Sequence, residues 1–125
     1  MTSTELRIGN LVEWNNEIGI ISQLFEMEVV FKCGESDLYT ALKPIPLTEE
    51  WLLKFGFKYD EDEQGFLLNG FHLENRSNDI YAKNINKEDF GCWFINSYLL
   101  EIKFVHQLQN LYFALTGEEL ILKNK

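Results

Sequence analysis

Residues 11–21 read LVEWNNEIGII, and this stretch predicts a β-hairpin. Two runs of mostly apolar residues, Leu11–Trp14 and Ile18–Ile21, flank the pair Asn15 and Asn16. Asparagine adopts a positive φ more readily than most non-glycine residues, so this pair favours a tight turn. Apolar runs on either side of such a turn predict two antiparallel strands.

The residues that follow this hairpin predict further short strands. The second strand is expected to reach about Phe25, and residues 27–31 mostly alternate between apolar and polar side chains, as a half-buried strand does. A turn is expected at residues 34–37 and a fourth strand at residues 38–42. Such a series of short strands within residues 1–47 suits a small, strongly bent barrel.

The same region resembles the opening of SH3-like barrels. Residues 8–12 and 19–21 supply a glycine-containing turn, a hydrophobic strand and a second strand that carries a glycine. We therefore expect an α+β protein that forms a single domain over residues 1–125. Residues 1–47 are expected to form an SH3-like β-barrel or meander, and residues 48–125 an α+β part.

The second part begins with a short helix and continues with hairpins. Thr48 is a good N-cap and Gly56 a good terminator, so residues 49–55 predict a helix. The pair Asn69-Gly70 between apolar runs predicts a hairpin with a tight turn. Further antiparallel strands are expected over residues 80–83, 92–95 and 99–102.

The last expected element is an amphipathic helix that ends at Gly117. Its apolar residues recur at helical spacing and are expected to pack on the sheet: Phe104, Val105, Leu108, Leu111, Tyr112 and Leu115. Its other face is expected to carry the neutral polar residues His106, Gln107, Gln109 and Asn110. That face is either merely solvated or makes directional hydrogen bonds.

Composition limits the classes of partner. The formal net charge is −9, so phosphate backbones and anionic lipids are repelled and basic surfaces attracted, although solubility alone explains many acidic proteins. Ten Phe, five Tyr and three Trp supply aromatic side chains for the core and, in part, for an interface.

No motif predicts catalysis, a metal or a cofactor. Residues 60–65 begin like a calcium-binding loop, but its twelfth position, which should supply a glutamate, is Phe71. The candidate transition-metal ligands Cys33, His72, Cys92 and His106 do not lie at ligand spacing. The two cysteines are expected to be buried, unpaired thiols in a reducing compartment.

The sequence carries no predicted export signal or membrane span. The first residues lack a basic segment followed by an apolar run, and no apolar stretch approaches the ~20 residues that a membrane helix needs. A cytoplasmic location is therefore expected.

Three blocks of the sequence resemble a group of small proteins from Bacteroidota bacteria and their phages. The most specific block is VHQLQNLYFALTGEEL at residues 105–120, and the others are residues 7–12 and 45–52. This resemblance implies a mobile-element setting, in which small acidic proteins often bind a host macromolecule. Inhibitors of defence nucleases, including anti-CRISPR proteins, are one such class.

The leading hypothesis is a non-enzymatic phage protein that binds, and inhibits, a host protein with a basic surface. A nuclease or ribonucleoprotein such as a CRISPR effector is the expected partner. The expected contacts are an acidic loop and the polar helix face: Asp60, Glu61, Asp62, Glu63, His106, Gln107, Gln109 and Asn110.

Two other hypotheses stay open. One is a nucleic-acid-binding small barrel that uses the lysines of the C-terminal part, namely Lys83, Lys87, Lys103, Lys123 and Lys125. The other is a structural or assembly protein that associates through exposed aromatic side chains.

Overall fold

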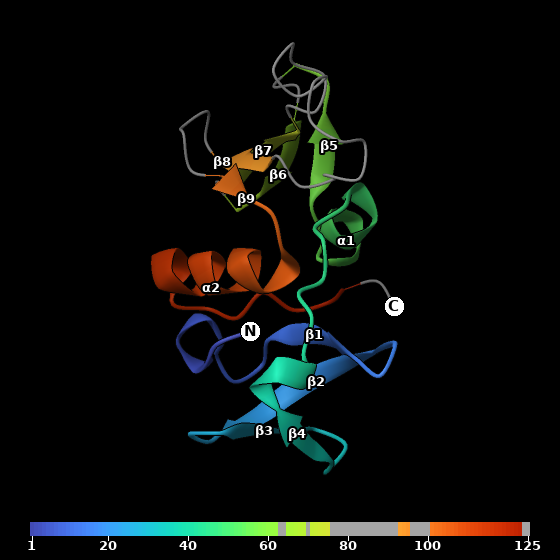
Figure 1. Cartoon of the computed structure of the whole chain (residues 1–125). Coiled ribbons are helices and arrows are strands. Elements are labelled where there is room, and N and C mark those ends of the chain that lie inside the picture. Colours follow the sequence, from blue (N-terminus) through green and yellow to red (C-terminus); the bar gives the residue numbers. More distant parts are fainter. Residues whose placement is uncertain (63–64, 70, 76–92, 96–100, 124–125) are drawn as a thin grey trace. The chain divides into compact units, whose positions relative to one another are not determined.

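The computed structural model describes residues 1–62, 65–69, 71–75, 93–95 and 101–123, and these form an α+β protein with two antiparallel sheets (Figure 1). The chain divides into two compact units. The first unit comprises Met1–Ile45 and Phe104–Glu119, and the second comprises Pro46–Lys103 and Leu120–Lys125. The boundary after Ile45 lies close to the division expected after residue 47, but the C-terminal helix belongs to the first unit.

The first unit contains a four-stranded sheet with strand order β1-β2-β3-β4. Its strands are β1 (Leu11–Trp14), β2 (Glu17–Leu24), β3 (Glu28–Phe31) and β4 (Ser36–Leu38). Two short 3-10 helices accompany them, η1 (Ser3–Glu5) and η2 (Tyr39–Ala41). Each strand pairs antiparallel with the next, as the short alternating segments predict.

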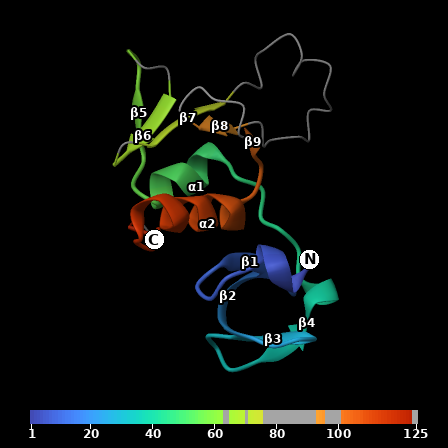
Figure 2. The same cartoon turned by 90° about the vertical axis from the view of Figure 1, so that its left-hand side faces the viewer.

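The predicted first hairpin is confirmed. Asn15 and Asn16 have φ angles of 53° and 63°, and Trp14 pairs with Glu17 across the turn. The sheet then curls, because β2 pairs with β1 through its first half and with β3 only from Ile21 onward (Figure 2). An antiparallel bridge from Lys43 to Glu13 brings the chain after β4 back to the free edge of β1.

The strand predicted over residues 38–42 is wrong. β4 ends at Leu38, and residues 39–41 form η2. Tyr39 and Leu42 are both buried, although a strand would turn side chains three residues apart to opposite faces. A 3-10 turn repeats every three residues and so presents both side chains to the same core.

The core of the first unit consists of seven buried side chains, namely Leu6, Val12, Ile21, Val29, Phe31, Tyr39 and Leu42. Val29 and Phe31 confirm the alternation predicted for the third strand. Met27, which fits the same pattern, is 70% exposed because it precedes β3, whose ladder starts at Glu28.

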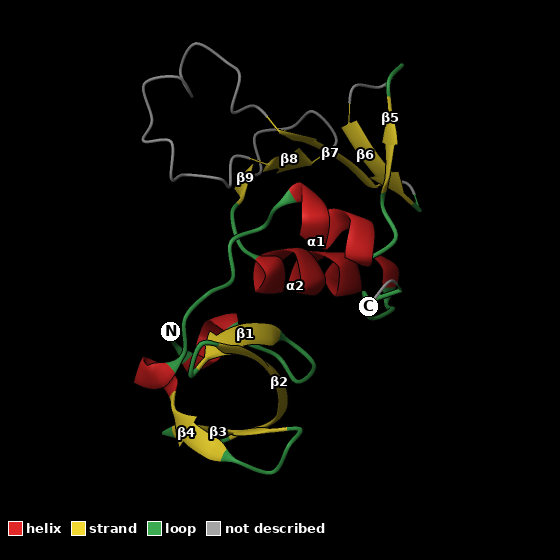
Figure 3. Cartoon of the chain, turned by 90° about the vertical axis from the view of Figure 1, so that its right-hand side faces the viewer, coloured by secondary structure: helices red, strands yellow, loops and turns green. Residues whose placement is uncertain are grey.

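The second unit combines one helix with a five-stranded sheet of order β5-β6-β7-β8-β9 (Figure 3). Its elements are α1 (Glu49–Lys54), β5 (Lys58–Asp60), β6 (Gly65–Leu68), β7 (Phe71–Asn75), β8 (Trp93–Ile95) and β9 (Glu101–Ile102). The strand expected over residues 80–83 lies outside the described residues.

Local sequence signals account for the elements of the second unit. The Thr48 side chain accepts a hydrogen bond from the Trp51 amide at the start of α1, and Gly56 follows the helix with φ 97°. The predicted hairpin is confirmed by the pairing of Leu68 with Phe71, next to Asn69 at φ 47°.

The last helix, α2 (Val105–Thr116), ends as predicted at Gly117, which has φ 75°. The Gly117 amide donates to the Phe113 carbonyl, so the terminal turn is closed. Among the described residues, no helix combines the length and the apolar character needed to cross a membrane.

Candidate functional site

The orientation of α2 differs from the one its pattern predicts. The helix buries Val105, His106, Leu108, Gln109 and Tyr112. Leu115, expected in the core, is 63% exposed. The buried arc is therefore displaced toward the amide side of the helix, and the expectation of a wholly solvent-facing polar face is wrong.

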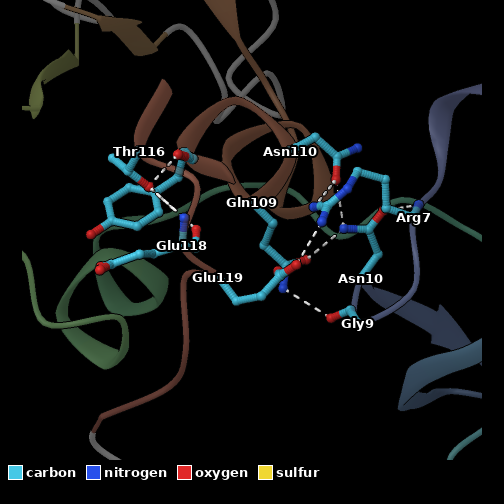
Figure 4. A network of polar contacts seen from close by, with 9 residues as sticks. Arg7, Gly9, Asn10, Gln109, Asn110, Thr116, Glu118 and Glu119 are labelled. Carbon is cyan, nitrogen blue, oxygen red and sulfur yellow. Dashed lines mark hydrogen bonds and ion pairs between the residues drawn. The ribbon is translucent and has the colours of Figure 1, made fainter. Parts of the chain in front are cut away.

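Gln109 explains this displacement through its hydrogen bonds to the start of β1. Its Oε1 accepts from the Leu11 amide at 2.9 Å and from Asn10 Nδ2 at 3.4 Å (Figure 4). Its Nε2 donates to the Gly9 carbonyl oxygen at 3.2 Å. Buried backbone groups need partners, and this single amide side chain supplies both an acceptor and a donor.

Asn110 and Arg7 extend the same network. Asn110 Oδ1 accepts from Asn10 Nδ2 at 2.8 Å, and Asn110 Nδ2 donates to the Glu5 carbonyl oxygen at 3.0 Å. Arg7 forms an ion pair with Glu119 at 2.5 Å, and its guanidinium lies 3.9 Å from the centroid of the Phe113 ring. These contacts join α2 and the turn after it to the N-terminal segment (Figure 4).

The expected partner-contact residues on α2 thus have different accessibilities. His106 and Gln109 are 1% and 3% exposed, Asn110 is half-buried within the network, and Gln107 is exposed. The Gln107 side chain accepts a hydrogen bond from the Phe104 amide and caps the helix start. Directional hydrogen bonding was one of the two expected uses of this face, but the bonds seen here are made within the chain.

His106 is buried without a hydrogen bond among the described residues. Its Nε2 lies 3.9 Å from Glu5 Oε2, and its ring stacks on Phe104 with the centroids 5.9 Å apart. Burial lowers the pKa of His106; the carboxylate of Glu5 opposes this shift, and the N-terminal ammonium adds to it. Folding therefore disfavours the charged form of the imidazole.

This pKa predicts an acid-sensitive fold. Because the pKa of His106 is lower in the folded chain than its ordinary value of 6.5, the unfolded chain binds a proton there more readily as the pH falls, and stability falls with it. The slope from this one group approaches at most about 1.4 kcal/mol per pH unit. Urea midpoints measured between pH 7.5 and 5.5 should fall for the wild type and fall less for His106→Phe. Equal slopes for the two proteins would contradict the assignment.

The expected acidic loop is only partly described. Glu61 and Asp62 are exposed, Asp60 is half-buried and accepts a hydrogen bond from the Asp62 amide at 2.9 Å, and Glu63 lies outside the described residues. Of the expected lysines, Lys103 and Lys123 are exposed, and the others lie outside the described residues. Among the described residues, no group of three His, Cys, Asp or Glu side chains could hold a metal ion.

A pocket of about 350 Å³ lies in the first unit, along the first half of β2 and the turn between β3 and β4. Its lining combines aromatic, aliphatic and charged residues: Trp14, Glu17, Ile18, Gly19, Ile20, Phe31, Lys32, Cys33 and Glu35. Ile18 and Ile20 are 54% and 39% exposed, although both lie within a strand.

The aromatic part of this pocket is held in a fixed orientation. The Trp14 and Phe31 rings stack with centroids 4.3 Å apart and an angle of 21° between their planes. The Trp14 indole N–H donates to Asp37 Oδ2 at 2.9 Å. This bond, followed by the bond from the Leu38 amide, lowers the pKa of Asp37 and keeps its carboxylate an acceptor.

Gly19 makes this aromatic packing possible. A Cβ atom at position 19 would lie 2.8 Å from atoms of the Phe31 ring, so only glycine lets the ring approach the β2 backbone this closely. Next to Phe31, Cys33 carries an exposed, unpaired thiol, which corrects the expectation that it is buried. Cys92 lies outside the described residues.

No family model, curated protein or solved structure matches the chain. The sequence pattern does not predict this pocket, although it contains one signal of it. Ile18, Ile20 and Ile21 place apolar side chains on both faces of one strand, and at least one face of a small sheet is normally solvated.

Proposed function

We propose that the chain is a non-enzymatic protein-binding module, and that the pocket beside β2 in its first unit recognises a basic protein partner. The observation that carries this proposal is the pocket itself, in which exposed isoleucines adjoin an aromatic pair of fixed orientation. Exposed apolar surface combined with rigid aromatic side chains is typical of protein interfaces.

Charge supports a basic partner. The first unit contains nine acidic and three basic residues, so it carries most of the net charge of −9. Glu17 and Glu35 lie in the pocket lining beside a single lysine, Lys32. Opposite charge on the partner would accelerate encounter and favour this surface over others.

Two finer proposals accompany this one. The curl of the first sheet and the Glu13–Lys43 bridge support an SH3-like barrel. The resemblance of residues 105–120 to proteins of Bacteroidota and their phages supports a cytoplasmic, phage-derived inhibitor of a nucleic-acid-handling protein such as a CRISPR effector. The net negative charge that would attract such a protein also favours a basic partner at the pocket.

The proposal predicts that Ile18→Lys strongly reduces partner capture without unfolding the chain. Ile18 is more than half exposed and lies opposite Glu13, so a lysine there gains a cross-strand partner. The new positive charge would repel a basic partner and weaken binding at least about tenfold, equivalent to about 1.4 kcal/mol.

Ile121→Lys is the matched control, because Ile121 is 62% exposed and belongs to the second unit. Immobilised wild-type, Ile18→Lys and Ile121→Lys proteins would be incubated with a Bacteroidota lysate, and the captured proteins quantified by mass spectrometry. Basic proteins should be retained by the wild type and Ile121→Lys and lost from Ile18→Lys. Identical capture by all three would contradict the proposal.

A further inference from the structure

The first half of β2 has one edge that no strand of the first unit covers. Residues 17–20 pair with β1 on one side, whereas β3 joins β2 only from Ile21 onward. Beyond that point the Lys32 amide donates to the Ile20 carbonyl at 2.8 Å, and the chain then enters the turn to β4. The pocket opens where β2 and this turn separate.

The hairpin register places the backbone groups of Ile18 on this edge. Trp14 and Glu17 flank the two-residue turn and form a hydrogen-bonded pair, so the next pair, Glu13 and Ile18, points its N–H and C=O groups outward. For Glu13 this is directly visible, because its outward groups bond to Lys43 at 2.9 Å in both directions. Within the described part of the chain, no residue takes up the corresponding groups of Ile18.

An unpaired strand edge beside a pocket is a template for an added strand. A segment at ordinary strand spacing, about 4.8 Å from β2, would accept a hydrogen bond from the Ile18 N–H and donate one to the Ile18 C=O. Its alternate side chains would point toward the pocket, whose lining includes Trp14 and two acidic residues, Glu17 and Glu35, beside the single lysine Lys32. An aromatic ring and two carboxylates suit an arginine or lysine side chain.

We propose that the partner binds as an extended segment that adds a strand to β2 at Ile18 and places an arginine or lysine side chain in the pocket. This binding mode rests on the proposed function. Charge complementarity identifies the occupant as a basic segment. Backbone hydrogen bonds to the edge of β2 would bind such a segment even if the segment has no folded structure of its own.

The probes for this mode are acetylated and amidated heptapeptide libraries whose central residue is arginine, lysine, glutamate or leucine. Binding is followed by hydrogen exchange of the Ile18 amide, because only a strand added at this edge protects that proton. The arginine and lysine libraries should slow this exchange at least tenfold more than the glutamate library. The tightest peptide selected should lose at least tenfold in affinity when the backbone nitrogen facing Ile18 is methylated.

Unchanged exchange at Ile18 with every library, or equal affinity of the methylated peptide, would overturn the added strand. Protection by the leucine library alone would overturn the basic side chain. A protected Ile18 amide in a dimer of the chain itself, lost with Ile18→Lys, would show that the edge serves self-association instead. Capture of basic proteins that depends on Ile18 while the peptides fail would leave the proposed function standing and remove only this binding mode.

Discussion

Leu108→Ala is expected to lower the free energy of unfolding by about 2–5 kcal/mol, a large share of the 5–15 kcal/mol typical of a small domain. Leu108 is fully buried on α2, so the truncation removes apolar contacts and leaves a cavity. Urea unfolding followed by circular dichroism measures the loss.

Leu115→Ala provides the same chemical change on the same helix at a site that is 63% exposed. It should change stability by less than about 0.5–1 kcal/mol. A pattern of residue types places both leucines in one apolar stripe, whereas the structure separates them. Equal losses for the two variants would favour the helix orientation expected from the pattern and contradict the one observed.

Gln109→Ala is expected to cost about 2–4 kcal/mol, because it leaves the buried Leu11 amide and the Gly9 carbonyl without their side-chain partner. The start of β1 should also open more often in this variant. Hydrogen exchange of the Leu11 amide would become faster in the variant, and the unfolding midpoint would fall.

Two companions separate hydrogen bonding from volume. Gln109→Met retains most of the side-chain volume but not the hydrogen bonds, so it should still lose most of the stability that Gln109→Ala loses. Gln107→Ala removes an exposed amide whose oxygen caps the helix start, and it should cost less than about 1 kcal/mol. If Gln109→Met proves as stable as the wild type, the network of Asn10 and Gln109 is not needed for the fold.

Local signals in the sequence predicted the turns and helix ends well. The Asn15-Asn16 and Asn69-Gly70 hairpins, the Thr48 cap and the Gly117 terminus all depend on the conformational preferences of a few adjacent residues. Such preferences act over one turn of chain and need no tertiary information. The strand predicted at residues 38–42 was wrong because local preferences did not decide the conformation there. The burial of Tyr39 and Leu42 in the core did.

The orientation of α2 could not be predicted from its periodicity. A hydrophobic pattern ranks side chains by their free energy of transfer from water to an apolar environment. By that criterion, Gln109 is expected on the solvent-exposed face. The structure instead matches Gln109 to backbone groups of residues 9 and 11, which lie about a hundred positions away in sequence. Buried polar groups follow their hydrogen-bond partners, which a pattern within one helix does not contain.

The pocket was missed for a related reason. Its lining comes from three separate segments, and its open edge exists because β2 leaves β3 at Ile21. In sequence, the isoleucines of β2 form the same apolar pattern as a buried core strand. Only the register of the hairpin shows which of them face solvent and where the backbone stays unpaired.

Contact between this pocket and a basic protein segment can be tested through Cys33. A photoreactive cross-linker attached to this exposed thiol in a Cys92→Ser background would sample the pocket directly. The reference is the same cross-linker at Ile121→Cys in a protein that lacks both native cysteines. After irradiation in a host lysate, mass spectrometry should identify partner peptides rich in arginine or lysine at Cys33 and not at position 121. Cross-links that are equally abundant at both positions, or none at Cys33, would contradict the claim.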